Sequence, residues 1–174
     1  LPPDGYLQKV RKICDEYGIL MIADEVITGF GRTGKLFGME HYGVVPDMMC
    51  FAKGVTSGYA QLGGVMLTGR LHEDFKRLSK DTLMHGYTYS GHPTACSVAL
   101  KNIEIIEREN LTENARIMGE ELLKGFRYLQ LKHEMIGDVR ALGLIGGISF
   151  VKDKATGERF ETPLSPKIAS GAAK

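Results

Sequence analysis

Two uninterrupted apolar runs of strand length, each ending at a charged residue, are the feature of this sequence that most constrains its fold. The first run, Ile19–Ala23, ends at Asp24, and the second, Met48–Ala52, ends at Lys53. A continuous apolar run is typical of a strand that is covered on both faces in a parallel sheet. A third run, Leu62–Leu67, follows the second. The alternation of these runs with helical segments predicts an α/β sheet protein.

The helices are predicted from apolar residues that recur every three or four positions. The first helix is expected between Asp4 as N-cap and Gly18 as stop, with Leu7, Val10, Cys14 and Tyr17 on its apolar face. A short amphipathic helix is expected around residues 71–78. Two long helices are expected from Pro93 onward, with a break near Asn110.

The last part of the chain is predicted to form a new strand and a turn. The run from Leu144 to Val151 has strand character, and the polar segment 152–158 is typical of a turn. The sequence begins without methionine at Leu1 and stops at Ser170–Lys174, where a helix is expected to begin. We therefore expect the chain to be a piece of a longer protein.

Composition excludes several classes of protein. The chain has 174 residues, 43% of them hydrophobic, enough to bury a core, and a net charge of +1, which argues against a nucleic-acid partner. Its three cysteines show no pairing pattern and no metal-binding spacing, so we expect reduced thiols and no metal. No apolar run approaches the roughly 20 residues of a membrane helix. We expect a soluble, cytoplasmic protein.

An acid and a lysine at the ends of strands suggest a particular chemistry. Ligands of open α/β sheets bind outside the carboxyl ends of the strands, where Asp24 and Lys53 are expected. A desolvated lysine amine attacks carbonyl groups, and a carboxylate can keep a heteroaromatic nitrogen protonated. Pyridoxal phosphate requires both groups. The alternative is that both residues end their strands only to meet water.

The segment from Gly29 to Lys35 matches two known phosphate-binding patterns. Its glycines fit the dinucleotide fingerprint, and Gly34-Lys35 nearly completes a P-loop. However, Leu36 follows where a P-loop needs Ser or Thr for magnesium, and residues 37–43 are too short and glycine-flanked for a phosphate-binding helix. We interpret both matches as coincidental, and a nucleotide-binding module built on Gly29–Lys35 remains an alternative.

The segment from His85 to Pro93 is dense in hydroxyls, aromatics and glycines. A turn of this composition can bind phosphate through hydroxyl and backbone N–H groups. It can equally be a connection whose side chains are satisfied locally. His85 and His92 lack the helical spacing of a zinc pair.

Read in order, three motifs resemble the class III aminotransferases. They are Leu20–Gly34, which contains Asp24-Glu25-Val26; Ala52-Lys53-Gly54, preceded by Pro46-Asp47; and Tyr87–Pro93. The resemblance spans nearly the whole chain. It implies a fold-type I, pyridoxal 5'-phosphate-dependent transferase, with a large, mostly parallel-sheet domain and a small C-terminal domain. On this basis residues 1–131 are expected to be the C-terminal portion of the large domain with its exit helices, and residues 132–174 the truncated start of the small domain.

The resemblance also implies roles for individual residues. Lys53 is expected to form the Schiff base, Asp24 to hold the pyridinium nitrogen, and Val26 to pack on the face of the ring. Thr88 is expected to reach the cofactor phosphate of the neighbouring subunit in a homodimer or homotetramer. The implied reaction moves an amino group from a small-molecule donor to a keto acid acceptor.

The resemblance has gaps as well. The family's phosphate loop and ring-stacking aromatic would precede Leu1, and its substrate-binding arginine would follow the last residue, so a non-catalytic fragment is a further alternative. Ala141 stands where glycine is common, Ser149 where glutamate is common, and Gln61 where proline is frequent. The segment 59–63 and the tail 151–157 are most similar to ω-amino acid:pyruvate enzymes, while other donors within the family remain open.

Overall fold

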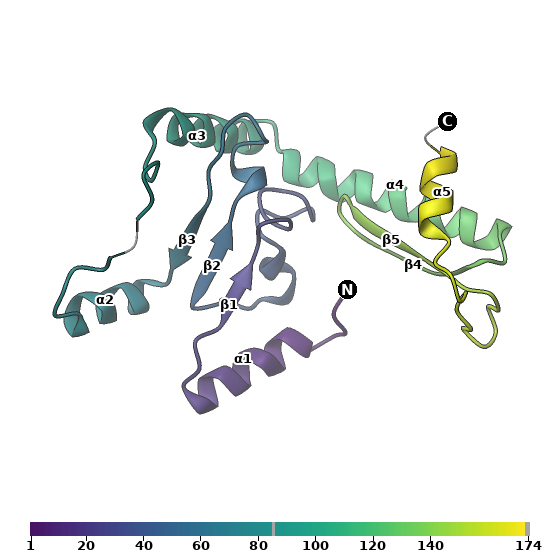
Figure 1. The fold of residues 1–174 in the computed structure, drawn as a ribbon, viewed down its shortest axis with the longest axis horizontal. Helices are drawn as coiled ribbons and strands as arrows, with labels where there is room; N and C mark the ends of the chain where they lie inside the picture. Colours follow the sequence, from purple (N-terminus) through teal and green to yellow (C-terminus); the bar gives the residue numbers. More distant parts are fainter. Residues whose placement is uncertain (85, 173–174) are drawn as a thin grey trace. The chain divides into compact units, whose positions relative to one another are not determined.

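The computed structural model describes residues 1–84 and 86–172 (Figure 1). The chain forms two compact units, one from Leu1 to Ala115 and one that begins at Arg116. The division after Ala115 falls inside the expected large domain, and a domain boundary after residue 131 stays a prediction about a longer protein.

The first unit contains a three-stranded sheet. Its strands are β1 (Ile22–Asp24), β2 (Met48–Phe51) and β3 (Gly64–Leu67), in the order β1-β2-β3. β1 and β2 run parallel, and β3 runs antiparallel to β2, as the arrows in Figure 1 show. All three apolar runs therefore form strands, and the prediction of an α/β sheet is confirmed. This portion of the sheet has one parallel and one antiparallel pair.

Three helices of the first unit lie where apolar spacing predicted them: α1 (Tyr6–Tyr17), α2 (Gly69–Leu78) and α3 (Pro93–Arg108). The left-handed Gly18 ends α1 as predicted, but Asp4 is not its N-cap. That position is held by Gly5, whose φ of 75° turns the chain, and no side chain caps the helix. Asp4 lies one residue too early to accept from the first turn. No helix in the described residues is long and apolar enough to cross a membrane.

The core of the first unit lies between α1 and one face of β1. Met21, Ala23, Met39 and Val44 are buried there, and apolar residues of α1 pack against them. The opposite face of β1 is open in this chain, because Ile22 is 57% exposed. Residues 1–84 and 86–172 leave this face uncovered, so coverage of the strand on both faces stays a prediction about a longer protein. An apolar run alone does not tell which residues cover it.

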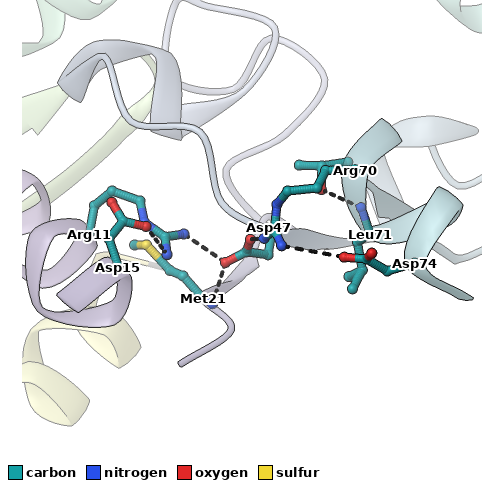
Figure 2. A network of polar contacts seen from close by, with 8 residues as sticks. Arg11, Asp15, Met21, Asp47, Arg70, Leu71 and Asp74 are labelled. Atoms are coloured by element: carbon teal, nitrogen blue, oxygen red, sulfur yellow. Dashed lines mark hydrogen bonds and ion pairs between the residues drawn. The ribbon is translucent and has the colours of Figure 1, made fainter. Parts of the chain in front are cut away.

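A buried carboxylate joins two helices to the N-terminal end of β2 (Figure 2). Asp47 accepts hydrogen bonds from the Met21 N–H at 2.8 Å, from Arg11 Nη1 at 2.7 Å and from Arg70 Nη2 at 2.6 Å. Arg11 belongs to α1 and Arg70 to α2. The Met21 N–H and the two guanidinium groups hold the pKa of Asp47 at about 2, below its ordinary value of 3.8. The Asp47 side chain thus links α1 and α2 to the residue that precedes β1.

The second unit is built on a β-hairpin. β4 (Ile136–Leu142) and β5 (Ile145–Phe150) pair antiparallel, α4 (Leu111–Lys132) precedes them, and α5 (Ser165–Ala172) ends the described chain. β5 and the polar turn after it confirm the prediction, since Asp153 Oδ1 accepts from the N–H groups of Ala155 and Thr156. β4 was not predicted. Gly137 and the polar residues Asp138 and Arg140 give this segment a turn-like composition, and only its pairing with β5 identifies it as a strand.

Two short 3-10 helices complete the first unit and lie beside the candidate site. The first, η1, covers Gly38–Tyr42, and the second, η2, covers Lys53–Val55. The break between α3 and α4 falls at Asn110, whose φ of 50° is left-handed, as the sequence indicated.

Candidate active site

Parallel pairing of β1 and β2 brings the predicted acid and lysine to the same edge of the sheet. Asp24 lies opposite Cys50 in the register, and the Glu25 N–H donates to the Cys50 carbonyl at 2.9 Å. Lys53 follows two residues after the end of β2. Both side chains therefore leave the carboxyl ends of neighbouring strands, which is the edge where open α/β sheets bind ligands.

Asp24 and Val26 are joined through a tight turn. The Val26 N–H donates to Asp24 Oδ1 at 3.0 Å, so one carboxylate oxygen is fixed by the backbone two residues on. No described residue donates to the other oxygen, and the Asp24 side chain is exposed. The carboxylate is oriented and retains an oxygen for a ligand, while Val26 lies half-buried at the start of the turn.

Lys53 has an unusual backbone conformation. Its φ of 43° places it in the left-handed region, which costs a residue with a Cβ on the order of 1 kcal/mol or more. Its exposed side chain lines an open depression of about 510 Å³, together with Ala52, Thr56, Gly58 and residues 60–63. Strain of this kind persists only where surrounding structure enforces it, and it concentrates at functional sites.

The backbone that follows Lys53 is held by residues that the sequence did not single out. Asn102 Nδ2 donates to the carbonyls of Gly54 and Val55 at 2.9 and 3.1 Å. On another side, a Cβ added to Gly54 would lie 3.0 Å from Phe30 Cβ, so only glycine fits there without displacement. No sequence pattern predicts that Asn102 and Phe30 hold the backbone after Lys53, because both contacts join segments that are distant in sequence.

The glycine-rich segment does not form a phosphate site. Glu25 is only 2% exposed, and its carboxylate accepts from the Gly38 and Met39 N–H groups at 2.9 and 2.7 Å. It also accepts from the Thr28 hydroxyl. The N–H groups at the start of η1 are therefore occupied by a side chain, and η1 is too short to offer the field of an α-helix.

The glycines of this segment serve packing instead. A Cβ at Gly29 would lie 2.8 Å from the Glu25 carbonyl and 3.3 Å from the Phe37 ring. Phe37 in turn contacts Phe30 edge to face, with centroids 5.4 Å apart, and Phe30 contacts Phe51 in the same manner at 5.8 Å. The geometry supports the interpretation that the nucleotide-binding match is coincidental.

Thr88 lies in a separate exposed turn. The Ser90 N–H donates to the Tyr87 carbonyl, and the Tyr87 N–H donates to Ser90 Oγ, both at 2.9 Å. Thr88 is exposed at the tip of this turn. No hydrogen bond between described residues joins Thr88 to Asp24 or Lys53. His85, which opens the predicted segment, lies outside the described residues.

The structure thus brings Asp24, Val26 and Lys53 to one edge of the sheet and leaves Thr88 on its own turn. No group of three or more His, Cys, Asp or Glu side chains in residues 1–84 and 86–172 could hold a metal ion. All three cysteines are free and partly buried. The arrangement places an amine and a carboxylate at the same edge of the sheet, with no metal-binding cluster among the residues described.

Comparison with known proteins identifies the family. The family model for class III aminotransferases matches residues 1–168. The taurine–pyruvate aminotransferase of Bilophila wadsworthia is 47% identical over the whole of this chain, which covers 39% of that protein. The chain therefore spans about two fifths of the length of the curated relatives it matches.

Solved structures agree with this assignment. A transaminase from the marine bacterium Virgibacillus superposes with a TM-score of 0.91 at 51% identity, covering 98% of this chain and 38% of that one. The taurine:2-oxoglutarate aminotransferase of Bifidobacterium kashiwanohense, solved with PLP and glutamate, gives 0.91 at 40% identity, covering 98% and 39%. The fold predicted from the resemblance is confirmed for this portion. The chain belongs to the class III aminotransferase family.

Proposed function

We propose that this chain supplies the lysine and the ring-nitrogen partner of a pyridoxal 5'-phosphate-dependent transaminase. The observation that carries the proposal is the position of Lys53. It stands in a strained left-handed conformation at the carboxyl edge of the sheet, beside the strand that ends at Asp24. Family membership over residues 1–168 supports the same conclusion.

The residues fit the chemical needs of this cofactor. Pyridoxal phosphate supplies an aldehyde for a covalent bond and a conjugated ring that accepts electrons. Lys53 Nζ would hold the cofactor covalently, and the same amine would serve as general base and acid for the proton. The Asp24 carboxylate would favour a protonated ring nitrogen, because an adjacent anion favours the charged form. Val26, in the turn that Asp24 Oδ1 closes, would supply an apolar contact to the ring.

The substrates proposed are an ω-amino acid or amine as donor and a keto acid such as pyruvate as acceptor. This follows the relatives, one of which pairs taurine with pyruvate and another taurine with 2-oxoglutarate. We also propose a symmetric homodimer or homotetramer in the cytoplasm, in which Thr88 reaches the phosphate of the neighbouring site. A large domain that ends near residue 131 belongs to the same proposal.

The test uses Lys53→Ala in a full-length protein that carries this chain. Purified wild type with added pyridoxal phosphate is expected to develop a visible absorbance band, and borohydride is expected to trap the cofactor on a peptide containing Lys53. Lys53→Ala should lose both signals and all transamination while its melting temperature is retained. Lys35→Ala is the matched control, because Lys35 Nζ donates only to the Glu40 carbonyl at 3.3 Å; it should behave as wild type.

The same samples distinguish the alternatives. Full turnover by Lys53→Ala would disprove the proposal. Tight ATP or NAD binding that Lys35→Ala abolishes would support the nucleotide-binding module instead. Residues 1–174 alone are expected to bind pyridoxal phosphate weakly and to show negligible activity. Absence of the visible band and of activity in the full-length wild type would favour a non-catalytic role.

A further inference from the structure

We propose that Asn102 is a positioning residue for Lys53: its side-chain amide fixes the turn that carries the lysine. The inference rests on the proposed function, because it concerns the presentation of Lys53 to pyridoxal phosphate. Asn102 lies in α3, far from Lys53 in sequence, and makes its contacts with η2 and with the residue two positions beyond it.

Three hydrogen bonds join Asn102 to this turn. Its Nδ2 donates to the Gly54 carbonyl at 2.9 Å and to the Val55 carbonyl at 3.1 Å, and its Oδ1 accepts from Ser57 Oγ at 2.9 Å. Asn102 is half-buried and Val55 is only 3% exposed. The side chain therefore binds the carbonyls of the two residues that directly follow Lys53, in a setting partly shielded from water.

The chemistry of the contacts requires an amide at this position. Both backbone carbonyls can only accept, so the NH₂ group must face them and the amide oxygen must face the Ser57 hydroxyl. An aspartate has nearly the same shape but no donor, and its negative charge would face two carbonyl oxygens. Asn102→Asp therefore removes the two bonds to the turn while the acceptor for Ser57 Oγ is retained.

Packing on another side confines the same turn. A Cβ at Gly54 would lie 3.0 Å from Phe30 Cβ and 3.2 Å from the Gly29 carbonyl. Backbone bonds from the Val55 N–H to the Ala52 carbonyl, and from the Thr56 N–H to the Lys53 carbonyl, close the turn itself at 3.2 and 3.3 Å. Both distances lie near the upper end of the N–H···O range, and the Asn102 amide adds two further bonds to the same turn.

The Lys53 side chain has no such support of its own. No hydrogen bond or ion pair holds Nζ among the described residues, and the side chain is exposed. The backbone at φ 43° therefore sets the direction of the Cα–Cβ bond, and with it the region that Nζ can reach. Because that conformation is unfavourable for a residue with a Cβ, loss of the Asn102 amide is expected to let the turn relax and to displace Nζ.

The experiment compares four variants in a full-length protein that carries this chain. Asn102→Ala and Asn102→Asp remove the bonds to the turn, and Ser57→Ala removes only the third bond. Thr68→Ala is the stability control, because Thr68 caps α2 through the Leu71 N–H and touches no part of the site. The readouts are amide exchange at residues 54–57 without cofactor, the rate of covalent attachment of pyridoxal phosphate, and the pH midpoint of its visible band.

We expect both Asn102 variants to exchange faster at residues 54–57, to attach pyridoxal phosphate about tenfold more slowly, and to shift the pH midpoint by roughly one unit. Thr68→Ala should keep the wild-type midpoint and attachment rate, even where its melting temperature falls, and Ser57→Ala, which retains both bonds to the carbonyls, should change them less than either Asn102 variant. If the Asn102 variants instead match Thr68→Ala in attachment rate and midpoint, Asn102 is only structural and the proposal fails.

Comparison of the wild type with the Asn102 variants distinguishes failure of this proposal from failure of the proposed function. If wild type formed no visible band, the proposed function would fail and the positioning role would fall with it, whatever the exchange data showed. If wild type forms the band, the proposed function holds and the Asn102 variants decide the positioning role alone. Should Asn102→Ala fail to fold, the near-isosteric Asn102→Asp supplies the same comparison.

Discussion

Arg11 Nη1 lies 2.7 Å from Asp47 Oδ2, an ion pair between side chains that are 18% and 7% exposed. The pair joins α1 to the start of β2, and Arg70 of α2 completes it from a far more exposed position, at 65%. Arg11 Nε is buried without a hydrogen-bond partner among the described residues. We therefore expect the stability of the first unit to depend on the Asp47 carboxylate, whose loss would leave Arg11 with only the exposed Asp15 as an ion-pair partner, at 2.7 Å.

We expect Asp47→Asn to lower the free energy of unfolding by about 2 to 4 kcal/mol, because it removes the anion from a largely buried ion pair and leaves Arg11 with Asp15 as its remaining charged partner. Arg70→Ala should cost less than about 1 kcal/mol, as its exposed ion pair is screened by water. Denaturant unfolding of both variants provides the measurement. Equal losses in the two variants would contradict a special role for the buried partner.

The same carboxylate predicts a pH dependence. Its pKa is held at about 2 in the folded protein, below the ordinary value of 3.8. A lowered pKa contributes stability that is fully present above the unfolded value and is lost as pH falls toward the folded value. We expect about 2 kcal/mol to disappear between roughly pH 4 and pH 2. Asp47→Asn, followed by denaturant unfolding over this range, should lack that component; an identical pH profile would rule it out.

Glu25→Gln tests whether the buried Glu25 carboxylate holds the start of η1. Both carboxylate oxygens of Glu25 accept from donors, so an amide NH₂ must face a donor and at least one bond is lost in a buried site. We expect a loss of about 2 kcal/mol in the free energy of unfolding. Glu16→Gln on the exposed surface of α1 should be nearly neutral. A neutral Glu25→Gln would show that the carboxylate does not hold η1.

Asp24→Asn is expected to weaken pyridoxal phosphate binding and to slow proton abstraction far more than it destabilises the protein. A neutral amide cannot favour a protonated ring nitrogen as an anion does, while the exposed side chain contributes little to packing. Cofactor titration, single-turnover kinetics and thermal unfolding of a full-length protein would measure the three effects. Unchanged rates with unchanged cofactor affinity would argue against the assigned role.

Thr88 is expected to act across a subunit interface, and a mixed dimer tests this. One subunit carries Lys53→Ala and the other Thr88→Ala. If Thr88 serves the neighbouring site, both lesions fall in one site and the other is wild type in activity and cofactor affinity. If Thr88 serves its own subunit, each site carries one lesion, and no site should match wild type at limiting pyridoxal phosphate.

Local sequence determined the elements and the identity of the main chemical groups. The apolar runs ending at Asp24 and Lys53 became the first two strands, and helical spacing placed α1, α2 and α3. Strand-length apolar runs and three-to-four-residue periodicity are local signals, so they predict strands and helices even when the tertiary contacts are unknown. The order of motifs also gave the family, which the comparison confirmed over residues 1–168.

Local chemistry was misleading where the outcome depended on distant partners. The glycines from Gly29 to Gly34 resemble a phosphate loop, yet Glu25 occupies the N–H groups of η1 and Gly29 packs against Phe37. Asp4 is a good N-cap residue by type, but the left-handed Gly5 starts the helix one residue later. β4 became a strand only because β5 folds back to pair with it.

The setting of Lys53 was decided by tertiary structure alone. Its left-handed backbone, the amide of Asn102 against the next two carbonyls, and the contact of Gly54 with Phe30 join segments that are far apart in sequence. No spacing rule encodes such contacts, since hydrogen bonds and close packing form wherever the chain brings groups together. The sequence by itself determined which residue carries the amine, and the fold decided how that amine is held, because orientation is a property of the surrounding contacts.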